Sequence, residues 1–313
     1  MKACLKIGHL FLWVGLLNNC VFQPGSSIYV GDKDLCGFAV SQYSGQGLRW
    51  DESKFPIPFY MHHSVPKNAK DNFISAVSHW NLRWTEYLQE EGVKPFPLFA
   101  VVDKHNLYNG KPGKDENNFL FFVDNKFSRY ESNPNTQAIT TIASMGHEIR
   151  DTDILVNDEA FDYYYDPSYN QEITLAENKI KESRRIASSR SPGLRFKIAE
   201  QFKQWLKFLL KPFTKQKAVR HIATPFPKIP RNKVDFPSLI IHELGHVPGL
   251  AHFSHDSLDY DQGYHRSKAR RSSKINSYHS VMEPRLSSGR ARRKVTDHDL
   301  DNLICGYLGV SRP

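Results

Sequence analysis

Between His242 and His252 the chain has the pattern His-Glu-x-x-His-x-x-Gly-x-x-His. This spacing restricts the local fold more than any other feature of the chain. His242 and His246 are four residues apart, so on a helix they share one face and are separated by a turn of about 5.4 Å. Gly249 permits the chain to leave that helix in a left-handed turn. The spacing therefore predicts a helix, a glycine turn and a third histidine that returns to the first two.

The residue types in this segment are those of a catalytic zinc centre. Neutral imidazole nitrogens bind zinc at about 2.0–2.1 Å, and three protein ligands leave the fourth position to water, whereas a structural site would need a fourth protein ligand. Glu243 adjoins the first ligand and is placed to take a proton from that water. The sequence therefore predicts one Zn²⁺ held by His242, His246 and His252, with Glu243 as the general base. Asp235 is the expected N-cap of the helix, with Pro237 in its first turn.

The rest of the chain has the pattern of a mixed α/β domain. Apolar residues at helical spacing predict an amphipathic helix over 68–88, whose Trp80 and Trp84 we expect in the core. Short apolar runs predict strands over 55–63, 97–102, 118–123, 138–143 and 153–157. One helix followed by several short strands favours a sheet with that helix packed across it.

Beyond these local patterns, the chain resembles the metzincin zinc metallopeptidases, and among them the secreted bacterial-type matrixins. The histidine motif is that of the metzincins, and Ser280-Val281-Met282-Glu283-Pro284 is similar to their Met-turn, in which the methionine forms an apolar floor beneath the zinc. Residues 149–157 resemble the strand along the substrate cleft, and residues 295–308 resemble the closing helix. Phe253 stands where matrixins have serine, which departs from the family pattern.

The resemblance implies an α/β (α+β) catalytic domain over residues 48–309. Its expected parts are a twisted, mainly parallel sheet, an active-site helix and a C-terminal helix. The expected activity is hydrolysis of peptide bonds in a protein or peptide substrate, which would pair with the edge strand near 153–157. The alternative is a catalytically silent metzincin-like protein that binds a surface.

A second metal has weaker support in the sequence. Acidic side chains at Asp151, Asp153, Asp158 and Asp162 offer oxygen ligands to Ca²⁺. Their order does not follow a calcium-binding loop, so a solvated acidic loop is the favoured interpretation.

The N-terminus has the pattern of an export signal. Lys2 and Lys6 precede an apolar run over 7–17, which is too short to span a bilayer as a helix. Cys20 closes this segment in an imperfect lipoprotein box, so lipidation of Cys20 remains open beside ordinary cleavage. Residues 21–47 then form a Gly- and Ser-containing leader. The expected location is extracellular or periplasmic, with or without a lipid anchor.

The remaining cysteines allow two interpretations. After export, Cys36 and Cys305 are left as a pair in an oxidising compartment, which favours a disulfide between them. The rival is a latency switch in which the Cys36 thiolate occupies the zinc before activation, because Cys36-Gly37 lies where matrixins carry such a switch. The flanking residues of that switch are missing here.

The charge of the chain is concentrated in two segments. The whole chain has a net charge of +9, while residues 179–233 carry sixteen Lys/Arg against two acids and residues 265–294 carry ten against one. The first segment belongs to an insertion over about 160–233, in which residues 194–213 predict a basic amphipathic helix. This helix either packs on the catalytic domain or binds an anionic surface, such as lipid or cell-wall polymer. Nucleic acid is disfavoured, and a monomer is expected.

Overall fold

The computed structural model describes residues 34–102, 108–113, 115–169, 171, 173, 174, 178, 228–253, 280–284 and 286–309. The chain divides into two compact units, residues 1–166 with 229–313, and residues 167–228. The first unit contains the histidine motif. The export signal, Cys20, the helix expected over 194–213 and most of both basic segments lie outside the described residues. No helix in the described part of the chain combines the length and apolarity needed to cross a membrane.

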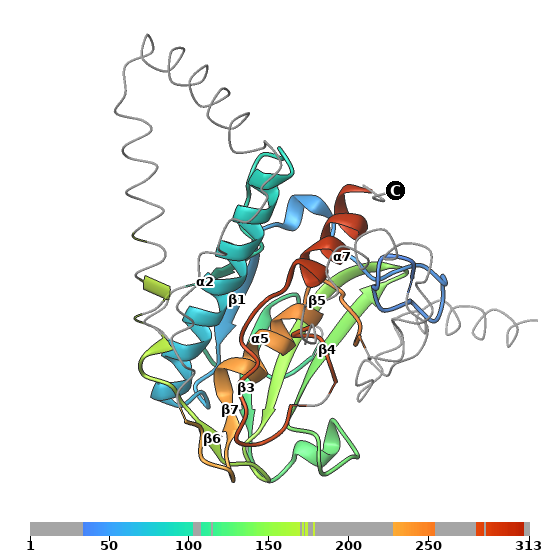
Figure 1. Ribbon diagram of the computed structural model, residues 1–313. Helices are drawn as coiled ribbons and strands as arrows, with labels where there is room; N and C mark the ends of the chain where they lie inside the picture. The colour runs from blue at the N-terminus through green and yellow to red at the C-terminus, as the bar shows by residue number, and fades with distance from the viewer. Residues whose placement is uncertain are drawn as a thin grey trace, which may run out of the picture. The chain divides into compact units, whose positions relative to one another are not determined.

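A five-stranded sheet forms the centre of the first unit, in the order β2-β1-β3-β5-β4 (Figure 1). Its strands are β1 (Ile57–Met61), β2 (Phe99–Val101), β3 (Asn118–Val123), β4 (Ala138–Met145) and β5 (Glu148–Asn157). All neighbouring pairs are parallel except β4 with β5, which is antiparallel. The expected mixed α/β domain with a mainly parallel sheet is therefore confirmed.

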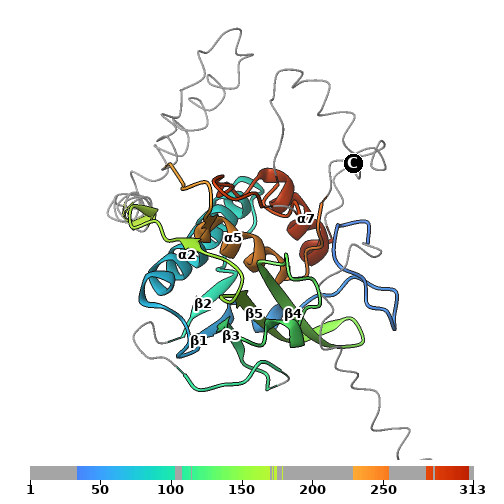
Figure 2. The ribbon, with the colours of Figure 1, turned by 90° about the horizontal axis from the view of Figure 1, so that it is seen from below.

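Three helices lie together on one face of the sheet, as Figure 2 shows. They are α2 (Lys67–Glu90), α5 (Phe236–His246) and α7 (Asp297–Leu308). The predicted apolar stripe of α2 is buried throughout, and Trp80 and Trp84 are fully buried in the core, as expected. The Trp80 indole also donates a hydrogen bond to the Ile241 carbonyl at 2.9 Å, so a core tryptophan of α2 helps fix the position of α5.

Smaller elements complete the unit. Two 3₁₀ helices, η1 (Glu52–Lys54) and η2 (Phe127–Arg129), lie in the connections, and β6 (Tyr163–Tyr164) pairs in parallel with β7 (Val234–Asp235). The strand β7 leads directly into α5, so the β6–β7 pair sets where the histidine helix begins.

The start of α5 is fixed by the residues that the sequence indicates. Asp235 is its N-cap and accepts a hydrogen bond from the Ser238 amide at 3.2 Å, with Pro237 in the first turn. The same carboxylate pairs with the buried guanidinium of Arg293, which also contacts Asp166. Arg293 donates from Nε and Nη2 to Asp235 and from Nη1 to Asp166, so a bidentate charge-assisted contact holds the start of the helix.

One expectation about the sheet is wrong. The sequence places the substrate beside the strand at 153–157, but this segment belongs to β5, which lies between β3 and β4. Both edges of β5 are therefore occupied by other strands. Among the described strands, the free edge on this side of the sheet belongs to β4, and any peptide that extends the sheet beside α5 must pair with β4.

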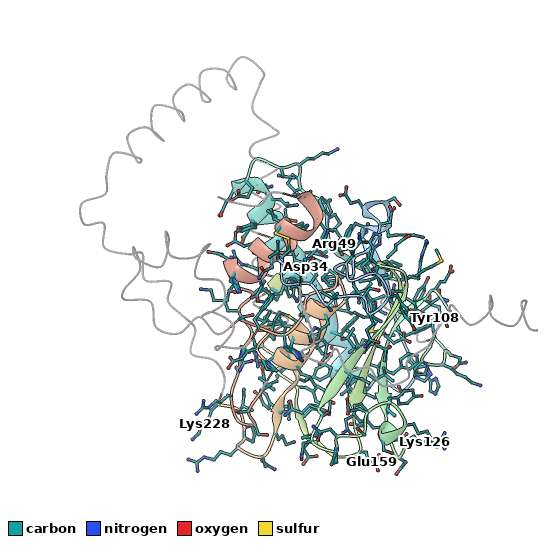
Figure 3. The ribbon with its side chains drawn as sticks, turned by 90° about the vertical axis from the view of Figure 1, so that its right-hand side faces the viewer. Asp34, Arg49, Tyr108, Lys126, Glu159 and Lys228 are labelled. Atoms are coloured by element: carbon teal, nitrogen blue, oxygen red, sulfur yellow. A yellow bond between two sulfur atoms is a disulfide. The ribbon has the colours of Figure 1, made fainter. Side chains whose placement is uncertain are left out.

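A covalent link joins the first and last described segments of the chain. A disulfide links Cys36 to Cys305 in α7, with 5.4 Å between their Cα atoms. It lies near the ion pair of Asp34 with Arg49 (Figure 3), whose N–O distance is 2.6 Å. Of the two alternatives for Cys36, a disulfide with Cys305 and a thiolate bound to the metal, the structure contains the disulfide.

Candidate metal centre

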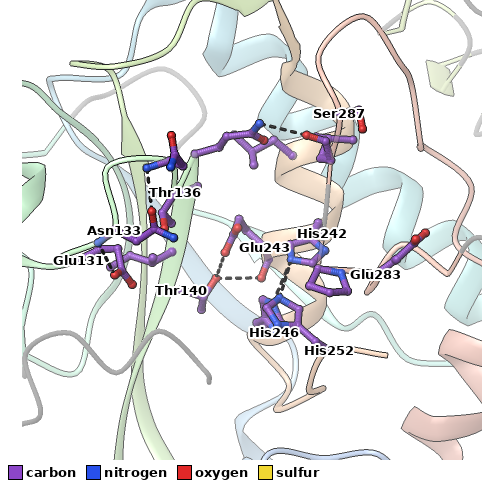
Figure 4. A pocket seen from close by; sticks show the side chains of 17 residues that line it. Glu131, Asn133, Thr136, Thr140, His242, Glu243, His246, His252, Glu283 and Ser287 are labelled. Carbon is purple, nitrogen blue, oxygen red and sulfur yellow. Dashed lines mark hydrogen bonds between the residues drawn. The ribbon is translucent and has the colours of Figure 1, made fainter. Parts of the chain in front are cut away.

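The three predicted histidines meet at one point of the structure. The Nε2 atom of His242 lies 3.1 Å from that of His246 and 3.1 Å from that of His252, and the remaining pair is 3.0 Å apart. Figure 4 shows the three rings converging beside Glu243. Within the described residues, they are the one set of three or more His, Cys, Asp or Glu side chains close enough to share a metal ion.

Backbone carbonyls orient two of these rings. His242 Nδ1 lies 2.7 Å from the Val281 carbonyl, and His246 Nδ1 lies 2.7 Å from the Leu250 carbonyl. A carbonyl only accepts, so each Nδ1 carries the proton and each Nε2 presents a lone pair to the common point. Tetrahedral zinc ligands at about 2.0–2.1 Å stand about 3.3–3.4 Å apart, so the observed spacing is slightly contracted but fits such an ion.

Gly249 produces the turn that returns His252 to the helix. Its φ is +106°, and a Cβ atom there would lie 2.1 Å from the Leu48 carbonyl oxygen. Both the conformation and the lack of space therefore require glycine. The returning segment is held by antiparallel pairing, because the Ala39 amide bonds the Gly249 carbonyl and the Ala251 amide bonds the Gly37 carbonyl. The disulfide at Cys36 anchors this pairing partner beside His252.

The segment that resembles a Met-turn lies directly under the helix. Met282 is fully buried, and a Cβ atom on Gly245 would lie 2.2 Å from the Met282 sulfur. Gly245 thus allows the methionine to lie against the helix between the two histidines of α5. The turn is held from below by Asp299 in the first turn of α7, whose carboxylate accepts from the Ser280 hydroxyl and the Val281 amide.

Burial sets the protonation of the histidines. Desolvation lowers the pKa of His242 to about 3 and that of His252 to about 4, and it lowers the pKa of His246 well below its ordinary value. All three rings are therefore neutral near pH 7, the form in which imidazole binds a metal.

Glu243 is buried next to the histidines and is positioned from the sheet. Desolvation raises the pKa of its carboxyl to about 7, and a hydrogen bond from Thr140 opposes this shift. The Thr140 hydroxyl lies 2.7 Å from Glu243 Oε2 and 3.1 Å from the Glu243 backbone carbonyl. A carboxyl group with a pKa near neutrality is suited to both taking up and releasing a proton.

A cavity of about 760 Å³ opens beside this centre. Its walls come from α5, from the start of β4 and the loop before it, and from the segment that follows Met282. The Gln137 side-chain amide donates to the Leu286 carbonyl at 3.0 Å and joins two of these walls. Glu131 lines the cavity on the side away from the three histidines (Figure 4).

Two of the four acidic residues considered for calcium, Asp151 and Asp153, have backbone amides as partners. Asp153 accepts hydrogen bonds from the Gly113 and Phe119 amides, both at 2.9 Å, and one oxygen of Asp151 accepts from two further amides of the same loop. Burial raises the pKa of Asp153 to about 8 and that of Asp151 to about 6. These carboxyl groups therefore hold Gly113, Asp115, Glu116 and Phe119 against β5.

Two residues of the site were not found from the sequence. Thr140 lies in Ala-Ile-Thr-Thr-Ile-Ala, where it alternates with Ala138 and Ile142 on the face toward α5. The sequence signal for Thr140 was a polar side chain at a strand position that alternation places toward the core. Glu131 gives no such signal, because it lies in an irregular loop whose place is set only by the fold. No family model, curated protein or solved structure matches the chain.

Proposed function

We propose that this chain is a zinc-dependent endopeptidase of the metzincin type, exported from the cell. The observation that carries the proposal is the convergence of three neutral histidine nitrogens beside a buried glutamate at the wall of an open cavity. The antiparallel edge strand, the glycine turn and the methionine beneath the helix support the resemblance to metzincins. The Cys36–Cys305 disulfide supports an oxidising compartment.

His242, His246 and His252 would hold the ion. A zinc ion bound there would polarise the scissile carbonyl and acidify the attacking water. Glu243 would take a proton from that water and pass it to the leaving amine. Thr140 keeps this carboxyl group in place, because its single hydroxyl hydrogen is directed at Oε2 and at the Glu243 backbone carbonyl, with the shorter distance to Oε2.

The edge strand β4 is the proposed docking line for the substrate. Within the described part of the chain its outer edge has free backbone donors and acceptors, and Thr140 in this strand contacts Glu243 directly. A peptide that adds to β4 as a further strand would pass beside the histidines, with its scissile carbonyl next to the metal. The cavity beyond would receive one of its side chains.

The test is peptide cleavage by the zinc-loaded full chain and by Glu243→Gln. We expect the substitution to lower kcat by about 10²–10⁴-fold without loss of zinc, because it removes the general base and leaves the ligands in place. Glu159→Gln, an exposed glutamate of the same domain, is the control and should keep full activity. Cleavage that survives in Glu243→Gln would remove the mechanism. Zinc binding without cleavage in the wild type would favour the silent surface-binding alternative.

A further inference from the structure

We propose that Glu131 makes the cavity beside the metal selective for a cationic substrate side chain, that is, lysine or arginine. This inference rests on the proposed peptidase function and names its substrate class. It starts from the position of one buried carboxylate that neither the metal site nor the core uses.

Glu131 is held rigidly at the wall of the cavity. It follows η2, and its amide bonds the Phe127 carbonyl at 3.1 Å. Phe127 in turn packs with Ile139 of β4 and Leu155 of β5 in a small buried cluster. The residue is only 7% exposed, and its Oε1 accepts a hydrogen bond from the Asn133 amide at 2.9 Å. The carboxylate is therefore fixed relative to the start of β4.

The charge of Glu131 is not neutralised within the described part of the chain. Its Oε2 has no hydrogen-bond or ion-pair partner there, and no Lys or Arg is found among the described residues that line the cavity. The other acid at the rim, Glu283, differs because Arg292 pairs with it at 3.0 Å. Glu131 Oε2 is not among the fully buried atoms that lack a partner, so it opens to the cavity, where a cationic group can form a charge-assisted hydrogen bond with it.

The remaining walls suit the other part of a lysine or arginine side chain. Leu239, Pro284 and Leu286 line the same cavity as Glu131. Lysine and arginine carry an aliphatic stem that packs on apolar surface and a charged head that needs a partner. The apolar walls can pack on the aliphatic stem, and the Glu131 carboxylate can pair with the charged head. A substrate leucine in the same position would leave Glu131 unpaired.

The experiment is a positional scan with internally quenched peptides and the zinc-loaded full chain. Each position within three residues of the cleaved bond carries in turn Lys, Arg, Gln, Leu or Glu. At one position we expect kcat/KM for Lys or Arg to exceed that for Leu or Gln by about 10- to 100-fold, the range for a charge-assisted hydrogen bond. Glu131→Gln should reduce this ratio to about threefold or less, and Glu131→Lys should turn the preference toward Glu.

The controls separate this inference from the proposed function. Glu159→Gln should keep the full Lys-to-Leu ratio, and thermal unfolding with zinc content should show that Glu131→Gln is folded and loaded. If no peptide is cleaved, the proposed function fails. The inference is then tested by the affinity of the same peptides, measured by fluorescence anisotropy, for wild type and Glu131→Gln. A wild type without preference for Lys or Arg, or a preference that persists in Glu131→Gln, would overturn the assignment of Glu131.

Discussion

The three histidines and the pair Asp151 and Asp153 form two buried polar clusters. They differ in the partners of their lone pairs. The three histidines bring their Nε2 atoms within 3.1 Å of one another, and the Nδ1 hydrogen bonds of His242 and His246 leave the Nε2 atoms of these two rings as lone pairs. Asp151 and Asp153 have three of four carboxylate oxygens occupied by backbone amides, and Asp151 Oδ1 alone lacks a partner among the described residues. Both clusters have pKa values shifted mainly by burial. A shifted pKa therefore reports burial, while converging lone pairs indicate a ligand.

The largest effect should come from removing one histidine. His252→Ala should abolish stoichiometric zinc binding. The loss of zinc affinity should exceed the roughly 10–100-fold loss that follows when a residue hydrogen-bonded to a ligand is removed. The unfolding free energy of the chelated protein should change much less than the zinc affinity, because the Nε2 atoms of His242 and His246 face His252 as lone pairs and the His252 ring can add at most one hydrogen bond to them. Calorimetric titration with zinc and urea unfolding measure the two quantities. His147→Ala, at an exposed histidine, is the matched control. Full zinc affinity in His252→Ala would mean that the cluster is not the ligand set.

A smaller effect is expected at the contact between sheet and general base. Thr140→Val should lower kcat about tenfold or more, because Glu243 loses a hydrogen bond to its charged form, while zinc content and KM stay nearly constant. Thr140→Ser should restore most of the activity. Thr141→Val, one residue along β4 and on its other face, should leave kcat unchanged. Equal losses in both valine variants would indicate a general disturbance of β4 rather than positioning of Glu243.

The smallest effect concerns the carboxylate cluster and pH. The folded pKa of Asp153 is about 8, above its ordinary value of 3.8, so the stability from this group is fully present below pH 4 and is lost as pH rises through 8. Between pH 7 and pH 9 the unfolding free energy of the chelated protein should therefore fall by about 1 kcal/mol. The histidines do not contribute in this range, because their pKa values are lowered, whereas Glu243, with a pKa of about 7, adds a smaller fall that Asp153→Asn leaves in place. Urea unfolding at both pH values measures the slope, and Asp153→Asn should flatten it. A slope unchanged in Asp153→Asn would assign the titration to another group.

Local patterns of the sequence were sufficient for the metal side of the site. The spacing of His242, His246 and His252 depends on one helix and one turn, so residue geometry alone predicts it. The same holds for the buried stripe of α2, whose apolar residues recur with the helical period. The N-cap at Asp235 was also readable, since capping involves only neighbouring residues.

The facing wall of the cavity was decided only by tertiary structure. Sheet order follows from pairing between distant segments, and this pairing placed β5 inside the sheet and β4 at its edge, against the expectation from the sequence. The contact of Thr140 with Glu243 spans 103 residues, and Glu131 reaches the cavity through a loop packed on two strands. Periodicity and motif spacing describe a single element and carry no information on which elements become neighbours. The sequence by itself determined the candidate metal ligands. The packing of β4 against α5 determined that Thr140 and Glu131 lie across the cavity from them.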